Sequence, residues 1–207
     1  MGSRERRQRQ QADTRQRILD AARDMFVLRG YEATTMRAIA DRVEYTPTAI
    51  YHHFRSKEAL ITELCQLDFR ALAQVFNRIE KVPDPLERLS RLGEAYVEFA
   101  IAHPNHYQLM FMTPRPQVVP DVAHGDPTED AYALLRATCA DAIAGNRLRP
   151  DIDDPDELAQ ILWAGLHGLV SLRIIKTHDP WLEWRDIRQS ATRMRESLVR
   201  GLLREPR

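Results

Sequence analysis

The amino-acid sequence predicts an all-α protein, with a small helical unit at the N-terminus and a larger helical body behind it. Apolar residues recur at three- and four-residue spacing along most of the 207 residues, which is the period of amphipathic helices. Capping residues such as serine, threonine and aspartate precede these segments, and glycine, asparagine or proline follows them. No stretch alternates polar and apolar residues for long enough to form a sheet.

Composition and cysteine usage fit a soluble protein of a reducing compartment. With 43% hydrophobic residues, the chain can bury a core in one or two compact units without disulfides or a structural metal. Cys65 and Cys139 lie far apart in predicted helices, so we expect buried or idle thiols. The longest uncharged stretch, residues 158–172, is shorter than the roughly 18 to 20 apolar residues of a bilayer crossing. We therefore expect no membrane span and a cytoplasmic location.

The net charge of zero hides a split along the chain. Residues 1–57 hold 12 Lys and Arg against 7 Asp and Glu, whereas residues 58–207 hold 18 against 23. A basic end joined to an acidic body favours a polyanion as the partner of the N-terminal part.

The first 30 residues predict a basic arm followed by a helix. Residues 1–13 are mostly arginine, glutamine and glutamate with nothing to bury, so we expect a flexible arm. From residue 14 onward an apolar face forms, and Gly30 stands where a helix C-cap belongs. Four arginines of the arm either stay solvated or enter a nucleic-acid minor groove, namely Arg4, Arg6, Arg7 and Arg9.

Two short helices follow, with about three residues between them. Thr35 is the expected N-cap of a helix over residues 36–43. Thr46 caps the next helix, and Pro47 takes its first position, where a missing N–H costs nothing. This is the helix-turn-helix arrangement.

The rest of the chain predicts six further helices around one irregular segment. The predicted helices run from Ser56 to about residue 79, and over residues 85–103, 105–112, 129–146, 155–177 and about 183–203. Residues 113–128 hold four prolines and one glycine and predict a loop. The helix over 155–177 is apolar nearly all round, so it must be covered on most sides, which a second subunit would do.

The second short helix has the chemistry of a helix that enters the major groove of DNA. Such a helix needs small polar residues at its N-terminus, where base edges are reached, and longer donors for the phosphates. Thr48 offers a hydroxyl and a methyl group to base edges, whereas Tyr51 and His52 suit phosphates. Lys57 can add its charge to the first turn of the next helix at another phosphate. The full set of expected DNA contacts is Thr35, Arg37, Thr46, Pro47, Thr48, Tyr51, His52 and Lys57.

Residues 14 to about 64 resemble the DNA-binding domain of the TetR family of bacterial transcription regulators. The resemblance rests on "TTMRAIADRV" and on "TPTAIYHHFRSKEAL", where Tyr-x-x-Phe is followed by Ser-Lys-Glu-Ala-Leu. It implies that the helix bearing Tyr51 is the recognition helix, that the eight residues above contact DNA, and that Ile50 and Phe54 belong to the core. The domains expected on this basis are the arm at 1–13, a helix-turn-helix DNA-binding domain at 14–58, and a helical effector-binding and dimerisation domain at 59–207.

Glu44 departs from the family pattern, which usually has glycine in this turn. If the position needs a positive φ, glutamate costs about 1 kcal/mol there. Its carboxylate would also weaken binding to a nearby phosphate. Tyr45 follows where a smaller aliphatic residue is usual.

The run "WAGLHGLVSLRII" is similar to a subset of TetR-like C-terminal domains that carry a Trp-His-Gly signature. This resemblance covers about residues 90–200 and implies an effector pocket and a dimer interface, but identifies no effector. A largely apolar pocket with a few polar groups is expected. Its candidate residues are Phe99, His103, Tyr107, Met110, Phe111, Trp163 and His167. Ordinary core packing with hydrogen-bonded histidines is the alternative for each of them.

These features predict a homodimeric, sequence-specific repressor that binds a palindromic double-stranded DNA operator and is released by a small-molecule effector. A DNA-binding regulator without an effector is the alternative. No enzyme, catalytic residue or cofactor is expected, because no GxSxG, HExxH, GxGxxG or Walker motif occurs. We also expect no metal. His103 and His106 have ligand spacing but are split by Pro104, and a helix N-terminus explains the acidic run at 151–157 better than a metal site does.

Overall fold

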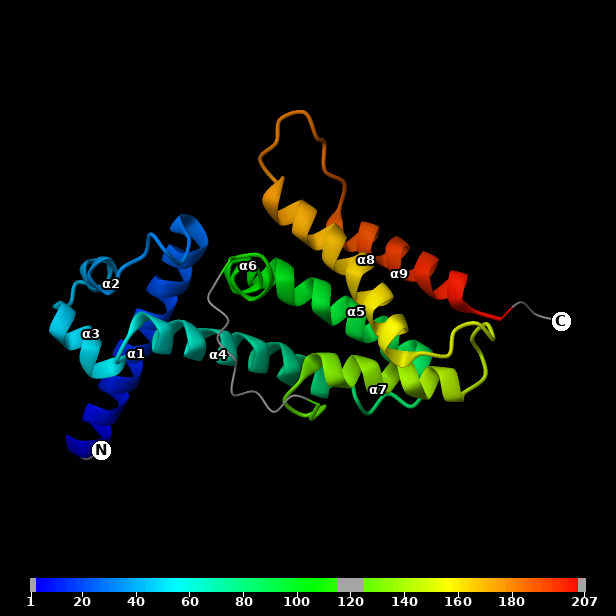
Figure 1. The fold of residues 1–207 in the computed structure, drawn as a ribbon, viewed down its shortest axis with the longest axis horizontal. Helices are drawn as coiled ribbons and strands as arrows, with labels where there is room; N and C mark the ends of the chain where they lie inside the picture. The colour runs from blue at the N-terminus through cyan, green and yellow to red at the C-terminus, as the bar shows by residue number, and fades with distance from the viewer. Residues whose placement is uncertain (1–2, 115–124, 205–207) are drawn as a thin grey trace. The chain divides into compact units, whose positions relative to one another are not determined.

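The computed structural model describes residues 3–114 and 125–204, and this part of the chain is built of α-helices (Figure 1). The helices are α1 (Ser3–Arg29), α2 (Met36–Arg42), α3 (Pro47–His53), α4 (Lys57–Asn77), α5 (Pro85–Ala102), α6 (Pro104–Phe111), α7 (Ala131–Ala144), α8 (Pro155–Ile175) and α9 (Ile187–Leu202). The extended pairing found within the described residues is an isolated bridge between Leu148 and Leu203. The all-α fold class is therefore confirmed. Most of the predicted loop at 113–128 lies outside the described residues.

The chain divides into two compact units. The N-terminal unit consists of Met1–Asp68 and Asn105–Asp121, and the C-terminal unit consists of Phe69–Pro104 and Val122–Arg207. α4 therefore begins in the N-terminal unit, and α6 lies in that unit from its second residue onward. The division expected from the sequence, after residue 58, differs because the first turns of α4 complete the core of the N-terminal unit.

The apolar faces of α1 to α4 form this N-terminal core. Its buried side chains include Ile18, Leu19, Ala22, Phe26, Ile39, Ala40, Ile50, Phe54, Leu60, Ile61 and Leu64. Ile50 and Phe54 are thus core residues, as the sequence predicts. α1 also ends as predicted, because Gly30 has a φ of 81° and donates its N–H to the carbonyl oxygen of Phe26 at 2.9 Å.

α1 begins at Ser3, so the prediction of a flexible arm is wrong for residues 3–13. Residues 4–13 are exposed and bury nothing. Arginine, glutamine, glutamate and alanine nevertheless have high helix propensity, and the extension of an existing helix avoids the cost of nucleation. A missing apolar face therefore argues against a new helix, but not against the continuation of one that packs further along.

Hydroxyl caps begin the three helices that follow α1. The side chains of Thr35, Thr46 and Ser56 each accept a hydrogen bond from the backbone N–H three residues later, at 3.1, 3.2 and 3.1 Å. Caps of this kind stabilise a helix start by about 1 kcal/mol. All three predicted N-caps are confirmed.

The turn between α2 and α3 passes through Glu44, whose φ is 62°. This is the left-handed region, which a side chain with a Cβ enters at a cost of about 1–2 kcal/mol. The position does need a positive φ, and this chain meets the need with a strained glutamate. The next residue, Tyr45, closes the turn by donating its N–H to the carbonyl oxygen of Ala40 at 3.0 Å.

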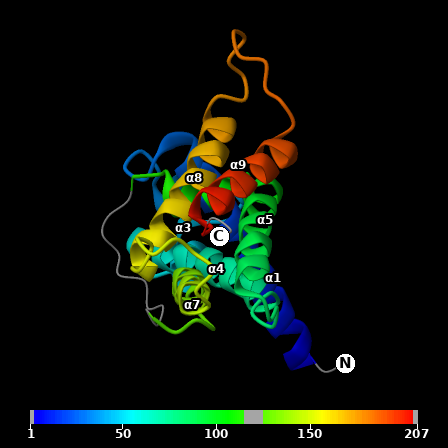
Figure 2. The ribbon, with the colours of Figure 1, turned by 90° about the vertical axis from the view of Figure 1, so that its right-hand side faces the viewer.

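α5, α7, α8 and α9 pack around the core of the C-terminal unit (Figure 2). That core contains Leu86, Leu89, Cys139, Ala142, Leu148, Leu158, Ala159 and Leu162. Gly165 lets α9 approach α8 closely, because a Cβ at this position would lie 2.8 Å from Leu198 Cδ1. Aspartates cap all four helices, namely Asp84, Asp130, Asp154 and Asp186.

α8 also carries apolar residues on the side that this core does not cover. Ile161, Leu172 and Ile175 are 41%, 56% and 60% exposed. Among the helices of the described residues, α8 alone is long and apolar enough to cross a membrane, a test that core and interface helices of soluble proteins also pass. Only 28% of its most apolar stretch is buried, so α8 needs a cover from outside its own unit.

Substitutions at Glu44 measure the cost of the strained turn. Glu44→Asn places a residue that tolerates the left-handed region, so the free energy of unfolding is expected to rise by about 0.5–1 kcal/mol. Glu44→Gln removes the charge but keeps the strain, so this matched control should stay within about 0.5 kcal/mol of the wild type. Urea denaturation measures both values. Equal stability of the two variants would contradict the strain at this position.

Candidate DNA-binding face and effector region

The residues expected to contact DNA are accessible at the starts of α2 and α3 and along α3. Seven of the eight are exposed, namely Thr35, Arg37, Thr46, Pro47, Thr48, Tyr51 and His52. Thr35 and Thr46 use their side-chain oxygens as helix caps. A hydroxyl that accepts a hydrogen bond keeps its own hydrogen, so both threonines can still donate to a phosphate oxygen.

α3 has a buried side and a polar side within two turns. At 100° per residue, Thr48, Tyr51 and His52 share one side of α3, and Ile50 faces the other. The burial agrees with this, because Ile50 is fully buried whereas Tyr51 is 52% exposed. α3 therefore presents a small hydroxyl, suited to base edges, one turn before a phenol and an imidazole, which are suited to DNA phosphates.

Lys57, the eighth expected contact, is held by Tyr31 within the N-terminal unit. Its ammonium nitrogen donates to the carbonyl oxygen of Tyr31 at 2.9 Å and lies 4.1 Å from the centre of the Tyr31 ring. Burial and a hydrogen bond to Glu58 raise the pKa of Tyr31 to about 12, so this ring stays a neutral phenol. Lys57 can reach a phosphate only by sharing or leaving these contacts.

Arg15 of α1 holds the C-terminal end of α3. Its Nη1 donates to the carbonyl oxygen of His53 at 2.7 Å, and its Nε donates to Glu63 Oε1 at 2.9 Å. Nη2 contacts the other carboxylate oxygen of Glu63, and the guanidinium carbon lies 4.3 Å from the centre of the Phe54 ring. Burial, followed by the charge of Arg15, lowers the pKa of His53 and so favours its neutral form. Arg15 thus joins α1 to α3 and α4 at one point.

The sequence pattern singled out neither Arg15 nor the role of Tyr45. Arg15 precedes Leu19 by one helical turn, so its place beside the buried face of α1 is the available signal. The Tyr45 hydroxyl lies 3.3 Å from Thr14 Oγ1, and the Arg17 guanidinium carbon lies 5.7 Å from the centre of the Tyr45 ring. The unusual aromatic residue therefore ties the turn to α1.

The seven residues expected to line an effector pocket belong to both units. Phe99, His103, Trp163 and His167 lie in the C-terminal unit, and Tyr107, Met110 and Phe111 lie in the N-terminal unit. Residues four positions apart are in ring contact, with centres 5.3 Å apart for Phe99 and His103 and 5.0 Å apart for Tyr107 and Phe111. Their contact with one ligand stays a prediction.

Tyr96 of α5 links two of these residues within the C-terminal unit. Trp163 Nε1 donates to the Tyr96 hydroxyl at 3.0 Å, and the same hydroxyl lies 3.1 Å from His167 Nδ1. Because an indole N–H can only donate, Tyr96 accepts from the tryptophan and can give its own hydrogen to the histidine. Burial lowers the pKa of His167, which agrees with a neutral imidazole that accepts at Nδ1. The sequence analysis missed Tyr96, although it lies one turn before Phe99 on α5.

The remaining candidate chemical groups have structural roles. Cys65 and Cys139 are buried, as expected, and burial together with the nearby charge of Asp156 raises the pKa of Cys139 to about 12. Asp154 caps α8, and Asp156 pairs with Arg136 at 2.8 Å, so the acidic run serves the helix start. In the part of the chain that the structure describes, no three His, Cys, Asp or Glu side chains are grouped to hold a metal ion.

Two family profiles match the chain. Residues 18–64 match the profile described as "Bacterial regulatory proteins, tetR family". Residues 89–198 match the profile described as "Tetracyclin repressor-like, C-terminal domain", which alone covers more than half of the chain. Neither match identifies the Trp-His-Gly subset, which stays a prediction.

Individual relatives agree with these profiles. The HTH-type transcriptional repressor KstR2 of Mycolicibacterium smegmatis is 34% identical over 152 residues, which is 70% of this chain and 72% of the relative. The HTH-type transcriptional regulator UidR of Escherichia coli K12 is 44% identical over 70 residues, which is 33% of this chain and 36% of the relative.

Solved structures show the same fold. The ketosteroid transcriptional regulator KstR2 of Mycobacterium tuberculosis superposes with a TM-score of 0.67 at 21% identity, over 92% of this chain and 95% of that chain. The fatty acid degradation regulator FadR of Bacillus halodurans superposes with a TM-score of 0.73 at 17% identity, over 91% and 96%.

Substitutions on α3 are expected to separate phosphate contacts from base contacts. Tyr51→Phe removes a hydroxyl assigned to a phosphate, so affinity for every duplex should fall by a similar factor of about 2–10. Thr48→Ala removes groups assigned to base edges, so discrimination between a preferred site and its single-base variants should fall by about tenfold. Fluorescence anisotropy titrations against both kinds of duplex measure this. A sequence-dependent loss for Tyr51→Phe, or a uniform loss for Thr48→Ala, would reverse the assignment.

Proposed function

Because the chain belongs to the TetR family of transcription regulators, we propose that it acts in the cytoplasm as a homodimeric repressor of a palindromic operator, released by a small, largely apolar ligand. The observation that carries the proposal is the polar side of α3. Thr48, Tyr51 and His52 are exposed there, while the opposite side is fixed by the burial of Ile50 and the contacts of Arg15. A rigidly mounted polar helix is what base recognition requires.

The exposed stripe of α8 supports the homodimer. It is symmetric about Gly168, with Ala164 and Leu172 four residues to either side and Ile161 and Ile175 seven residues to either side. At 100° per residue, all five fall within a sector of about 80°. In an antiparallel pair of α8 helices that cross at Gly168, Ala164 would meet Leu172 of the second copy, and Ile161 would meet Ile175. From Gly168 to the Ala164–Leu172 pair and on to the Ile161–Ile175 pair, the combined side-chain volume grows, as the space between two diverging helices does.

Two further features fit the same antiparallel pairing. Apart from the backbone of α8 and the chain neighbours of Gly168, no atom of the described residues lies within 4 Å of the position where a Cβ of Gly168 would stand, so a second helix can approach there. Glu157 lies in the first turn of α8 on the same side as the stripe, and Lys176 is the C-cap at the other end. Antiparallel copies would place the acidic end of one beside the basic end of the other.

The aromatic residues of α5 and α8 support the apolar ligand. Three polar groups, Tyr96, Trp163 and His167, meet on helices whose other buried residues are apolar, which is typical of small-molecule sites. The name of one relative, a ketosteroid regulator, makes a ketosteroid a reasonable first probe for this chain. A regulator without an effector is favoured by a different observation, because these three groups already satisfy one another.

Selection of binding sites from random duplex DNA with the purified protein tests the proposed function. The enriched pool should contain a palindrome whose half-sites are about one helical turn, 34–36 Å, apart. Enrichment of single half-sites would contradict the homodimer. No enrichment at low salt, with or without a ketosteroid, would contradict DNA recognition by α3.

Cysteine cross-linking tests the crossing at Gly168. A residue on a two-fold axis meets its own copy, so Gly168→Cys alone should cross-link under a short bismaleimide, and so should the double variant Ile161→Cys/Ile175→Cys. Ala102→Cys, exposed on α5, is the matched control and should remain uncross-linked. The native cysteines are buried and should not react. A dimer in which Ala102→Cys cross-links and Gly168→Cys does not would contradict this crossing.

A further inference from the structure

Within the N-terminal unit, two arginine–carboxylate pairs join α1 to α4. Arg15 pairs with Glu63 next to the end of α3, and Arg23 pairs with Asp68 two turns further along α1. The two arginines are about 12 Å apart along α1, since each residue adds 1.5 Å. Two contacts so far apart fix the angle at which the helices cross, whereas a single contact would let them pivot.

The Arg23–Asp68 pair is buried. Nε donates to Oδ2 at 3.1 Å and Nη2 donates to Oδ1 at 2.9 Å, and the side chains are 4% and 2% exposed. Burial alone would lower the pKa of Arg23, but the hydrogen bonds and charge of Asp68 outweigh it and raise that pKa. Nη1 of Arg23 also donates to Asp20 at 2.8 Å. The hydrogen bonds from Arg23 offset the burial of the Asp68 carboxylate, because the transfer of a charged group out of water costs several kcal/mol.

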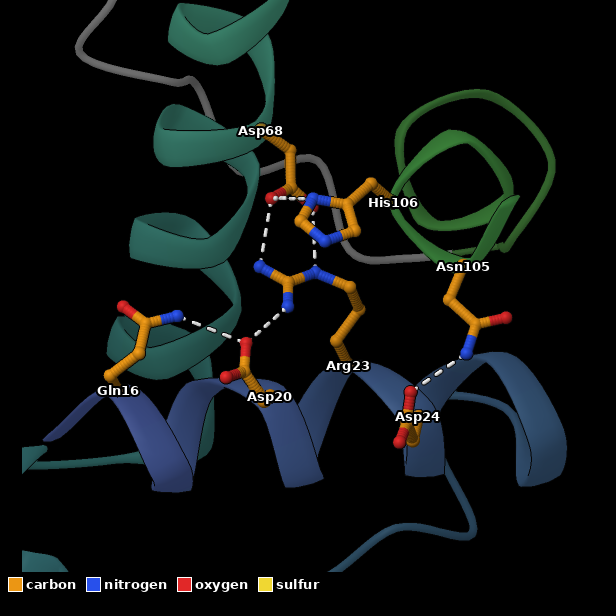
Figure 3. Close-up of polar contacts among 7 residues, drawn as sticks. All are labelled: Gln16, Asp20, Arg23, Asp24, Asp68, Asn105 and His106. Carbon is orange, nitrogen blue, oxygen red and sulfur yellow. Dashed lines mark hydrogen bonds and ion pairs between the residues drawn. The ribbon is translucent and has the colours of Figure 1, made fainter. Parts of the chain in front are cut away.

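A third helix contributes to the same carboxylate. His106, in the first turn of α6, places its Nδ1 2.9 Å from Asp68 Oδ1 (Figure 3). The adjacent Asn105 donates its side-chain N–H to Asp24 Oδ1 on α1 at 2.7 Å. Figure 3 shows Arg23 and His106 approaching Asp68 from different helices, with the Asn105–Asp24 contact beside them. The first turn of α6 is thus attached to both α1 and α4 by polar side chains.

We propose that His106 is a positioning residue, through which the first turn of α6 sets the α1–α4 crossing and therefore the presentation of α3. The proposal rests on the proposed function, because the consequence of the crossing is read out as operator binding. The path is continuous within the N-terminal unit. It runs from His106 through Asp68 and Arg23 to α1, and from α1 through Arg15 to the end of α3.

Because His106 is less buried than Arg23, its contact with Asp68 can be broken and re-formed more easily. The His106 side chain is 31% exposed, although its Nδ1 is buried against Asp68, so the ring can leave when α6 moves and water can then take the place of Nδ1. Loss of Arg23 would instead leave the carboxylate of Asp68 buried without its cation, which destabilises proteins strongly. Movement of α6 can therefore release one of the partners of Asp68 and loosen the crossing without unfolding the unit.

Variants of His106 in the full-length protein test the proposal. His106→Leu removes the contact, whereas His106→Asn keeps a polar nitrogen the same number of bonds from the backbone as Nδ1. His178→Leu, in the exposed segment between α8 and α9, is the matched control for loss of a histidine. Each variant is titrated against the selected operator and against operators whose half-sites are one base pair closer or further apart.

The expected result is specific to a positioning role. His106→Leu should bind the selected operator about tenfold more weakly and lose most of its preference for the selected spacing over the altered ones. His106→Asn should restore both properties, and His178→Leu should match the wild type.

Three outcomes would overturn the proposal while leaving the proposed function intact. The first is wild-type affinity and spacing preference in His106→Leu, the second is a loss that His106→Asn does not restore, and the third is an equal loss in the control His178→Leu. Failure of the proposed function has a different signature, because the wild-type protein itself would then select no operator.

Discussion

The N-terminal unit depends on how it accommodates one buried carboxylate, that of Asp68. An apolar pair of similar size would often be as stable as the Arg23–Asp68 pair, so stability alone does not explain the charges. Bidentate hydrogen bonds do what apolar contacts cannot, because they are satisfied at only one relative position of the two helices. Since Arg23 belongs to α1 and Asp68 to α4, the need to pair this charge fixes the crossing of those helices.

This fixed crossing allows α3 to be short and polar. A helix of seven residues is unstable alone, so α3 depends on the burial of Ile50, on the following Phe54 and on Arg15. Because these contacts use one side and one end of α3, the side chains on its other side remain exposed. The strain at Glu44 fits the same division, since a well-packed frame can tolerate about 1–2 kcal/mol in the turn before α3.

Local signals explain what could be predicted from the sequence. The caps at Thr35 and Thr46 and the small polar start of α3 depend on residues within one turn of each other, so the helix-turn-helix could be recognised without a structure. Asp68 shows that such signals do not predict contacts between residues distant in sequence. It stands in the ladder Leu60, Leu64, Asp68, Leu72, which marks it as a buried charge, but its partner Arg23 lies 45 residues away. Tyr96 was missed for the same reason, because Trp163 and His167 are 67 and 71 residues further along.

α8 and α3 raise two physical problems that one assembly would solve. The exposed apolar stripe of α8 is unfavourable in water, and a single α3 reaches too few base edges for tight binding, since each good base contact contributes only about 1–3 kcal/mol. A dimer would cover the stripe and also tether two recognition helices, so that the second half-site binds at a high effective concentration. A coupling of about 1–3 kcal/mol between ligand and spacing would then disturb both half-sites at once. The affinity for DNA that dimerisation adds is therefore lost when a small change in the distance between the two recognition helices occurs.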